Sequence, residues 1–211
     1  MNIKTVLFDL DGTLIDTNEL IYVSFKYTFD KYGYSFSREE ILEFNGPPLI
    51  ETFMNVNPEK ADDMLKTYRE HNFQHHNDLV TVFPNVIETL ESLRENGIKM
   101  GIVSTKMRNG VELGLEVTKL KHFFDSIVSL DDVQNAKPHP EPVLKGMKEL
   151  KGAPETTIMI GDNFQDIESG KNAGVKTAGV AWSLKGVDVL KRHDPTYILN
   201  DMQDLLPIIG V

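Results

Sequence analysis

The sequence predicts an α/β protein, in which a parallel β-sheet alternates with helices and an all-helical segment is inserted after the first strand. Three observations lead to this fold class. A short apolar run at residues 6–8 reads as a buried strand. Residues 17–79 then carry helix-period apolar patterns, and strand and helix patterns alternate from residue 80 onward. Because strands separated by helices imply a parallel sheet with right-handed crossovers, we divide the chain into a core, residues 1–16 and 80–211, and a helical domain, residues 17–79.

The first strand ends in two carboxylates. Val, Leu and Phe at residues 6–8 are followed by Asp9 and Asp11, and then by Gly12 and Thr13. Acidic residues at the carboxyl end of a central strand lie where open α/β sheets bind ligands. Two carboxylates one residue apart repel each other. Their closeness is useful where a cation binds between them or where the two have different roles. A turn after a strand is the ordinary explanation of such a motif, so the motif does not decide the function alone.

The segment at residues 17–79 is predicted to be helical throughout. Ser37 with Glu40 forms a capping box, which predicts a helix starting near Arg38. The Gly-Pro-Pro run at residues 46–48 ends that helix, and the Asn-Pro pair at residues 57–58 begins another.

Alternating elements follow in the rest of the chain. A helix over residues 86–95 ends at an Asn-Gly pair, which is a good C-cap signal. The remaining predicted strands and helices are, in order, a strand at 99–103, a helix from about 108, a strand at 127–128, a helix at 140–150, a strand at 157–160, a helix at 163–173, a strand at 175–180 and a helix at 202–209.

Composition narrows the class of protein. The 211 residues are 40% hydrophobic and 26% charged, as in a soluble globular protein. A net charge of −10 without a basic stripe argues against nucleic-acid and membrane binding, and no run is long enough to span a bilayer. The absence of cysteine excludes disulfides, thiol catalysis and thiolate metal sites, and the absence of a signal pattern predicts a cytoplasmic enzyme. A phosphate site in so acidic a chain must be made positive locally.

Three further polar groups stand where predicted strands end. Ser104, Thr105 and Lys106 follow the strand at 99–103, and a hydroxyl there can donate to a phosphoryl oxygen. Lys137, fixed by the proline after it, offers a positive charge just before a helix. Taken singly, a helix N-cap explains Ser104 and a surface position explains Lys137.

The third group is acidic. Asp162 and Asp166 follow the strand at 157–160, four residues apart at a strand-to-helix turn, where they can hold a hard cation through oxygen. N-capping by Asp162 with Asp166 in the first helical turn is the alternative.

Taken in order, these motifs resemble the signature of the haloacid dehalogenase (HAD) superfamily. That signature is D-x-D-x-T, here residues 9–13, then a Ser or Thr, here Ser104, then Lys137, and then G-D-x-x-x-D at residues 161–166. The resemblance covers the whole chain, because residues 17–79 match the helical cap that many members insert. It implies a Rossmann-like parallel-sheet HAD core with an all-helical cap domain.

The resemblance also implies a role for each motif residue. Asp9 would be the nucleophile that accepts the phosphoryl group, and Asp11 would protonate the leaving group and then activate water. Thr13 would orient the loop, Ser104 would bind phosphoryl oxygens, and Lys137 would neutralise charge on Asp9 and the phosphate. This division of labour suits a transition state that spreads charge over three oxygens.

Magnesium is the implied cofactor. Asp9, the main-chain carbonyl of Asp11 and Asp162 would hold Mg²⁺, with Asp166 acting directly or through water and Asn163 a weaker candidate. Members that dehalogenate carbon substrates lack an acid at the position of Asp11, so its presence points to phosphate chemistry.

Longer runs resemble one group within the superfamily. They are TLIDTNELI, FNGPPLIETF, SLDDVQNAKPHPEPVL, GDNFQDIESGKNAG and KTAGVAWSLKG. These runs look like the HAD-type inorganic pyrophosphatases that accompany HPr kinase/phosphorylase. The resemblance implies hydrolysis of pyrophosphate to two phosphates, which would pull forward dephosphorylation of serine-phosphorylated HPr. The alternatives are phosphoglycolate phosphatase or another small phosphomonoester phosphatase, a sugar phosphomutase, and a non-catalytic phosphate-binding regulator.

Substrate choice is expected to come mainly from the cap, because the core contacts only a phosphoryl group. Gly46 and Pro47 are candidates for a rigid loop that closes over the leaving group, although a plain helix–helix connector fits them equally. Among core residues, Thr105 and Lys106 are candidates for substrate binding, and so is Arg108. Basic residues of the cap, Arg69 among them, are more typical of solvated helix faces.

Overall fold

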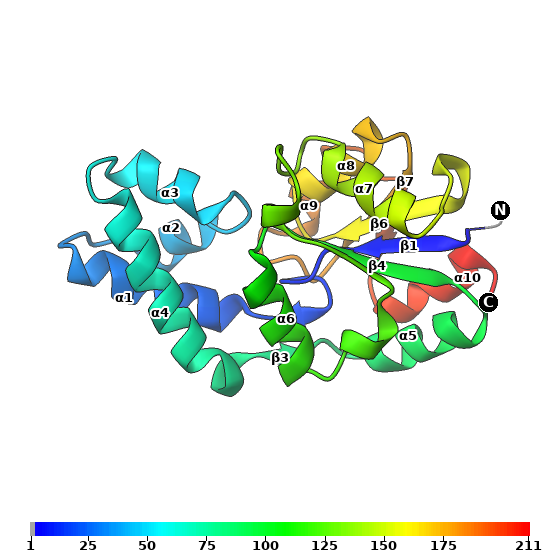
Figure 1. The fold of residues 1–211 in the computed structure, drawn as a ribbon, viewed down its shortest axis with the longest axis horizontal. Coiled ribbons are helices and arrows are strands. Elements are labelled where there is room, and N and C mark those ends of the chain that lie inside the picture. The colour runs from blue at the N-terminus through cyan, green and yellow to red at the C-terminus, as the bar shows by residue number, and fades with distance from the viewer. Residues whose placement is uncertain (1–2) are drawn as a thin grey trace.

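The structure, a computed structural model, describes residues 3–211 and contains a six-stranded sheet beside a group of four helices (Figure 1). Each pair of neighbouring strands in this sheet is parallel, which confirms the predicted α/β class. In spatial order the strands are β5 (Ser126–Val128), β4 (Lys99–Val103), β1 (Thr5–Phe8), β6 (Thr157–Gly161), β7 (Lys176–Val180) and β8 (Tyr197–Leu199).

Strand β1 lies at the centre of the sheet and is buried on both faces. Leu7 packs in one hydrophobic cluster with Val143 of α7 (Glu141–Glu149). Val6 and Phe8 belong to the cluster on the opposite face, which includes residues of α5 (Val86–Glu95). Because both faces are covered, the strand is continuously apolar instead of alternating, which is why it could be recognised from sequence.

Helices cover the sheet on both sides. In Figure 1, α7 and α8 (Phe164–Asn172) lie above the sheet, whereas α5 and α10 (Leu205–Ile209) lie below it. Helix α6 (Arg108–Val117) follows β4. The other helical elements of this part are α9 (Val187–Lys191) and the 3₁₀ turns at Lys121–Phe123, Leu130–Asp132, Pro154–Thr156 and Met202–Asp204.

The four remaining helices form a separate group, called the cap below. They are α1 (Asn18–Lys31), α2 (Arg38–Glu43), α3 (Leu49–Val56) and α4 (Ala61–Leu79). The capping box of Ser37 and Glu40 is present, and α2 starts at Arg38 as predicted. Across the described residues, no helix has the length and apolar character needed to cross a membrane.

Aromatic side chains hold the cap together. The Phe25 ring lies 4.7 Å from the Tyr68 ring, 5.6 Å from the Phe29 ring and 5.7 Å from the Phe53 ring, centroid to centroid. These four residues belong to a hydrophobic cluster distinct from the two that flank the sheet. The cap therefore has a core of its own.

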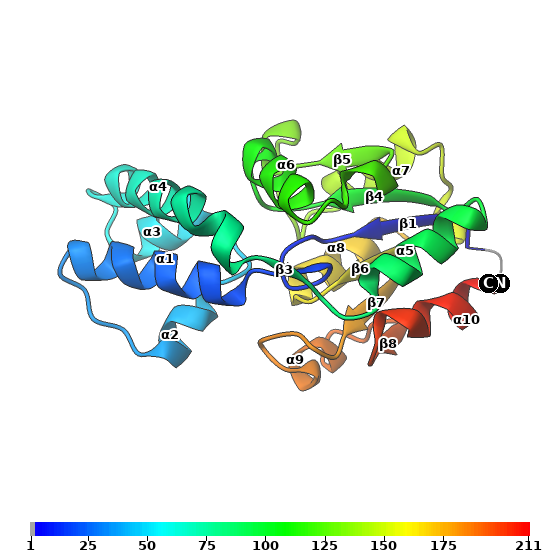
Figure 2. The ribbon, with the colours of Figure 1, turned by 90° about the horizontal axis from the view of Figure 1, so that it is seen from below.

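A short antiparallel hairpin joins the cap to the sheet. It pairs β2 (Ile15–Asp16) with β3 (Thr81–Val82), the segments just before α1 and just after α4 (Figure 2). This hairpin was not predicted from the sequence, because two-residue strands far apart in the chain leave no periodic signal. Strand β8 and helix α9 were not predicted either, and the single helix predicted at 202–209 is a 3₁₀ turn at Met202–Asp204 followed by α10.

Replacing Phe25 with Ala should destabilise the cap, because the change opens a cavity among the rings that pack against Phe25. We expect the free energy of unfolding to fall by about 3–5 kcal/mol. Phe73→Ala is the matched control, since the Phe73 side chain is 64% exposed. Urea titration would measure the loss, and hydrogen exchange should show faster exchange in α1, α3 and α4 than in the sheet. Equal stabilities for the two variants would contradict a separate aromatic core.

Candidate active site

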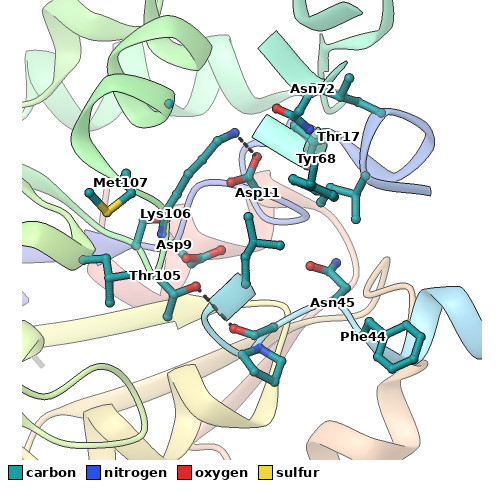
Figure 3. A pocket seen from close by; sticks show the side chains of 18 of the residues that line it. Asp9, Asp11, Thr17, Phe44, Asn45, Tyr68, Asn72, Thr105, Lys106 and Met107 are labelled. Carbon is teal, nitrogen blue, oxygen red and sulfur yellow. Dashed lines mark hydrogen bonds and ion pairs between the residues drawn. The ribbon is translucent and has the colours of Figure 1, made fainter. Parts of the chain in front are cut away.

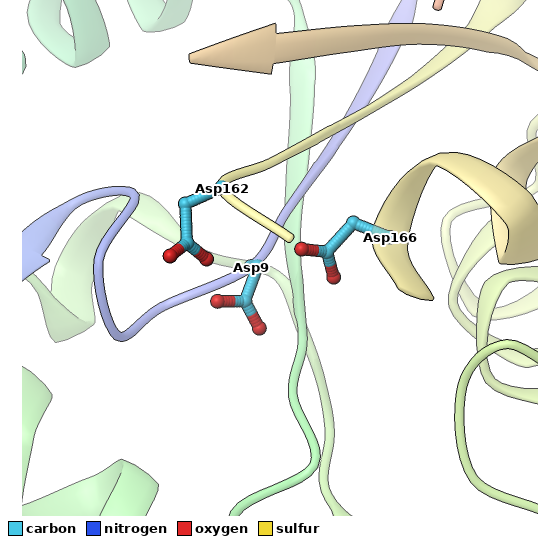
Figure 4. A group of neighbouring side chains, drawn as sticks. All are labelled: Asp9, Asp162 and Asp166. Carbon is cyan, nitrogen blue, oxygen red and sulfur yellow. The ribbon is translucent and has the colours of Figure 1, made fainter. Parts of the chain in front are cut away.

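Buried carboxylates converge at the carboxyl edge of the sheet. Asp9 follows β1, Asp162 follows β6, and Asp166 lies in the first turn of α8. Each offers an oxygen, and these oxygens lie within 4.8 Å of one another (Figure 4). All three residues are buried. Because β1 and β6 are parallel neighbours, motifs about 150 residues apart in the chain meet at one point of the sheet edge.

Lys137 is the cation that this cluster holds. Its Nζ donates to Asp9 Oδ1 at 2.7 Å, to Asp166 Oδ1 at 2.5 Å and to the Val103 carbonyl at 2.8 Å. The side chain is only 3% exposed. Burial works to lower the pKa of Lys137, but the two carboxylates outweigh it and raise the pKa above its ordinary value. All three ammonium hydrogens therefore have acceptors, and Lys137 stays charged.

One lysine does not balance the carboxylates. Burial raises the pKa of Asp9 to about 7; Lys137 opposes this rise, and the charge of Asp166 adds to it. The pKa of Asp162 is also well above its usual range, first because of burial and then because of Asp9 and Asp166. Clustered carboxylate oxygens short of positive charge are the donor set that a hard divalent cation prefers.

Glycine makes this close packing of carboxylates feasible. A side chain at Gly12 would place its Cβ 2.4 Å from Asp162 Oδ2, and the Gly12 backbone has a φ of +80°. No other residue type fits both the conformation and the space. The D-x-D-G turn after β1 thus lets the Asp162 carboxylate lie against the backbone of the first motif.

Asp166 differs from the other two carboxylates because both of its oxygens already accept hydrogen bonds. Oδ1 accepts from Lys137, and Oδ2 accepts from the backbone N–H of Asn163 at 3.0 Å. Its geometry suits an anchor for Lys137 and for the start of α8, or a contact to a metal through water. The Asn163 side chain caps α8 by accepting from the Phe164 N–H at 2.8 Å.

Lys106 reaches the second acid of the first motif. Its Nζ donates to Asp11 Oδ1 at 3.1 Å, and both side chains are partly buried (Figure 3). The Ser104 hydroxyl accepts from the Lys106 N–H at 3.1 Å, which shapes the loop after β4. Ser104 and Lys106 therefore stand on the same side of the site as Asp9 and Asp11.

The Gly46–Pro47 loop of the cap contacts the core directly. The Thr105 hydroxyl donates to the Gly46 carbonyl at 3.3 Å (Figure 3), and the Asn163 side-chain amide donates to the Asn45 carbonyl at 3.4 Å. Gly46 has a φ of +121°, and a Cβ at this position would lie 2.4 Å from the Asn163 amide nitrogen. The loop therefore joins the cap to the core through two hydrogen bonds, as well as connecting α2 to α3.

A cavity of about 180 Å³ lies between the cap and the core. The core contributes the carboxylates, Ser104, Thr105, Lys106 and Lys137, and the cap contributes Gly46, Pro47 and one face of α4. Arg69 belongs to this face, although its position in the sequence is typical of a solvated helix surface. Thr13 is fully buried and is not part of the lining.

Arg108 does not reach the cavity. Its guanidinium donates to the Asp132 carboxylate and to the Ile127 carbonyl, and its backbone N–H donates to Asp131. These contacts fasten the start of α6 to the loop after β5. The sequence shows that Arg108 lies near Ser104. It does not show that Arg108 binds Asp131 and Asp132, which lie more than twenty residues later in the chain.

Comparison with known proteins identifies the family to which this fold belongs. Residues 6–180 match the family described as haloacid dehalogenase-like hydrolase. The chain belongs to this family. The HAD resemblance predicted from the motifs is confirmed, and the protein is a hydrolase. HAD hydrolases generally use a divalent metal, and the carboxylates of Asp9, Asp162 and Asp166 provide suitable oxygen donors for one.

Curated HAD relatives align with the whole chain. A protein of Oceanobacillus iheyensis named Pyrophosphatase PpaX is 55% identical over 100% of this chain and 98% of its own length. A second Pyrophosphatase PpaX, from Anoxybacillus flavithermus, is 51% identical over 100% and 99% of the two chains. Among solved structures, a haloacid dehalogenase-like family hydrolase from Streptococcus pneumoniae superposes with a TM-score of 0.88 at 27% identity and covers 98% of each chain.

The raised pKa of Asp9 should make the metal-free HAD core lose stability as the pH rises. Folded Asp9 retains a proton up to about pH 7, whereas the unfolded chain releases it near pH 4, so the unfolding free energy falls across that window. Asp9→Asn removes this titration and should be more stable than wild type near pH 8, by on the order of 2 kcal/mol. Thermal melts in a chelator across this range would test this, and a difference that does not vary with pH would contradict it.

Gly46→Ala should open the cap. The new Cβ meets the Asn163 amide in the closed form, and the backbone conformation disfavours a side chain. We expect the closed fraction to fall about tenfold relative to the open one, as a cost of ~1.4 kcal/mol implies. Gly33→Ala is the matched control, because Gly33 also has a positive φ but no atom lies near its Cβ position. Small-angle X-ray scattering should show a larger radius of gyration for Gly46→Ala alone; equal radii would contradict closure through this loop.

Proposed function

We propose that this protein is a Mg²⁺-dependent inorganic pyrophosphatase that hydrolyses pyrophosphate to two phosphates through a phosphoryl group carried on Asp9. The observation that carries the proposal is the Lys137-held Asp9 carboxylate, packed against Asp162 and beside the Asp11–Lys106 pair, at the bottom of a cavity closed by the cap. The names of relatives that match the whole chain at 51–55% identity favour pyrophosphate as the substrate.

In the first step, an oxygen of Asp9 attacks the nearer phosphorus atom, and the bond from that phosphorus to the bridging oxygen breaks. Lys137 fixes the orientation of the Asp9 carboxylate through Oδ1 and keeps a positive charge beside it. Asp11 delivers a proton to the departing phosphate. Lys106, held 3.1 Å from Asp11, supplies positive charge where the leaving oxygen gains electrons.

In the second step, water attacks the phosphorus of the acyl phosphate. Asp11, now a carboxylate, removes the proton from this water, and the bond between phosphorus and the Asp9 oxygen breaks. The second phosphate leaves and the Asp9 carboxylate is restored. One acid therefore serves twice, first as proton donor and then as proton acceptor.

Asp9, Asp162 and the main-chain carbonyl of Asp11 would hold the magnesium ion, with Asp166 behind them as anchor for Lys137. When bound, Mg²⁺ supplies positive charge that offsets the carboxylate cluster and the phosphoryl oxygens. Ser104 and Thr105 line the cavity, where the Ser104 hydroxyl can donate to a phosphoryl oxygen. Thr13, which is fully buried, would act by packing within the first-motif loop.

The cellular setting is part of the same proposal. A pyrophosphatase in the cytoplasm would consume the pyrophosphate released when HPr kinase/phosphorylase removes phosphate from HPr. The resemblance of the longer sequence runs supports this link, which is functional and needs no stable complex.

Asp9→Asn should abolish turnover, because an amide cannot form the acyl phosphate. We expect magnesium-dependent phosphate release from pyrophosphate to fall by at least about 10³-fold. Asp188→Asn, which removes a carboxylate from an exposed site on α9, should leave the rate unchanged. A phosphate-release assay would compare both variants with wild type and with wild type in a chelator.

The substrate is tested by running phosphoglycolate and a hexose phosphate alongside pyrophosphate. A kcat/KM for pyrophosphate that exceeds both by about a hundredfold or more supports the proposed function. A preference for phosphoglycolate would replace the substrate but leave the Asp9 chemistry in place. A wild-type protein that binds phosphate and hydrolyses none of these compounds would point to a regulator.

A further inference from the structure

One face of α4 forms the cap side of the cavity. Arg69, Asn72 and His76 all line it, and their spacings of three and four residues place them on a single face of the helix. Figure 3 shows Asn72 and Tyr68 of this helix on the side of the cavity where Asp11 and Lys106 meet. The α4 face thus lies opposite the core groups that would act on a leaving group.

Among the described residues, Arg69 is the cation of this cavity that has no partner. Lys137 is bound to Asp9 and Asp166, and Lys106 is bound to Asp11. Within residues 3–211, no hydrogen bond or ion pair engages the Arg69 side chain, and the residue is exposed at the cavity. Among the described residues, four carboxylates and three cations line the cavity, and both lysines are already paired with carboxylates. The Arg69 guanidinium is therefore the positive charge available to a bound anion.

The inner end of the same face carries a second unpartnered group. His76 is 1% exposed, and neither of its ring nitrogens has a hydrogen-bond partner. Burying an imidazole in this way costs free energy that an apolar side chain would avoid. Asn72, between Arg69 and His76 in the chain, donates to the Ser24 hydroxyl at 3.4 Å, so the described groups of this face that lack an internal partner are Arg69 and His76. Polar groups that line a cavity in this state are expected where a polar ligand group binds.

We infer that Arg69 binds the leaving phosphate of pyrophosphate and that the α4 face around it is the subsite that separates pyrophosphate from phosphate esters. The inference rests on the proposed function. The core machinery contacts the phosphoryl group being transferred, which is the same in a diphosphate and in an ester. A leaving phosphate differs by its charge and its oxygens, and a guanidinium can donate to two of those oxygens at once.

The other basic residues do not fill this role equally well. Lys106 lies near the leaving group but shares its charge with Asp11. Arg108 is held by Asp132 outside the cavity. Lys66 lies one turn before Arg69 on α4 but is not part of the lining, and its side chain is 77% exposed beside Glu70.

The test replaces Arg69 with Gln and uses Lys66→Gln as the matched control, because both variants remove one positive charge from an exposed position of α4. The first measurement is competitive inhibition of para-nitrophenyl phosphate hydrolysis by methylenediphosphonate and by inorganic phosphate. We expect Arg69→Gln to weaken diphosphonate inhibition about tenfold and to change phosphate inhibition by less than about twofold. Lys66→Gln should change neither, and Arg69→Lys should recover part of the loss.

The second measurement is turnover. Arg69→Gln should lower kcat/KM for pyrophosphate by about 10–100-fold while changing kcat/KM for para-nitrophenyl phosphate by less than about threefold. Equal losses for both substrates would show a general role in folding or closure and would overturn the inference, as would unchanged diphosphonate inhibition.

Failure of the proposed function has a different signature. Wild-type protein that hydrolyses the ester but not pyrophosphate would reject pyrophosphatase activity. The inhibition experiment needs no pyrophosphate turnover, so it still decides whether Arg69 binds a second phosphate-like group. A diphosphonate that inhibits wild type and Arg69→Gln equally would reject the subsite whatever the substrate is.

Discussion

The structure depends on the packing of buried carboxylates around a single ammonium at the edge of the sheet. Lys137 joins three elements, because its acceptors come from the ends of β1 and β4 and from the first turn of α8. Without it, Asp9 and Asp166 would be buried charges with no cation, which is far more costly than an exposed ion pair. The parallel sheet brings these strand ends together, and Gly12 leaves room for Asp162.

The cap is well packed internally but only lightly attached to the core at its closing loop. Phe25 and its neighbouring rings form a dense core, whereas the loop contacts of Thr105 and Asn163 with the cap are long hydrogen bonds of 3.3 and 3.4 Å. Breaking such contacts costs much less than unpacking aromatic rings. On the proposed function, separation of the cap from the core at this loop would let product leave the cavity, while the β2–β3 hairpin keeps the two parts joined.

Features that have a local signal in the sequence could be predicted. The strand of residues 6–8 is buried on both faces, the capping box of α2 involves residues three apart, and the acidic motifs adjoin their strands. Features that depend on contacts between residues far apart in the chain could not be predicted. Nothing near Arg108 shows that Asp132 will bind it, and nothing near Arg69 shows which face of α4 meets the core. The pairing of β2 with β3 could not be predicted either, since a strand of two residues is too short to show an alternating pattern in the sequence.

This contrast has a physical basis in how the two halves of the cavity are made. The core half must hold carboxylates that repel one another at fixed distances. Short sequence motifs place these carboxylates at the strand ends, and Lys137 binds two of them. The cap half needs only to present a cation on a helix that approaches when the loop closes. The Arg69 guanidinium, which has no partner among the described residues, can bind the substrate. Its interaction with the leaving group is strongest when that group is itself negatively charged. On the proposed function, the contact between Arg69 and the leaving phosphate thus both stabilises the closed cap and recognises the substrate. This contact forms only when the cap and the core meet around the substrate.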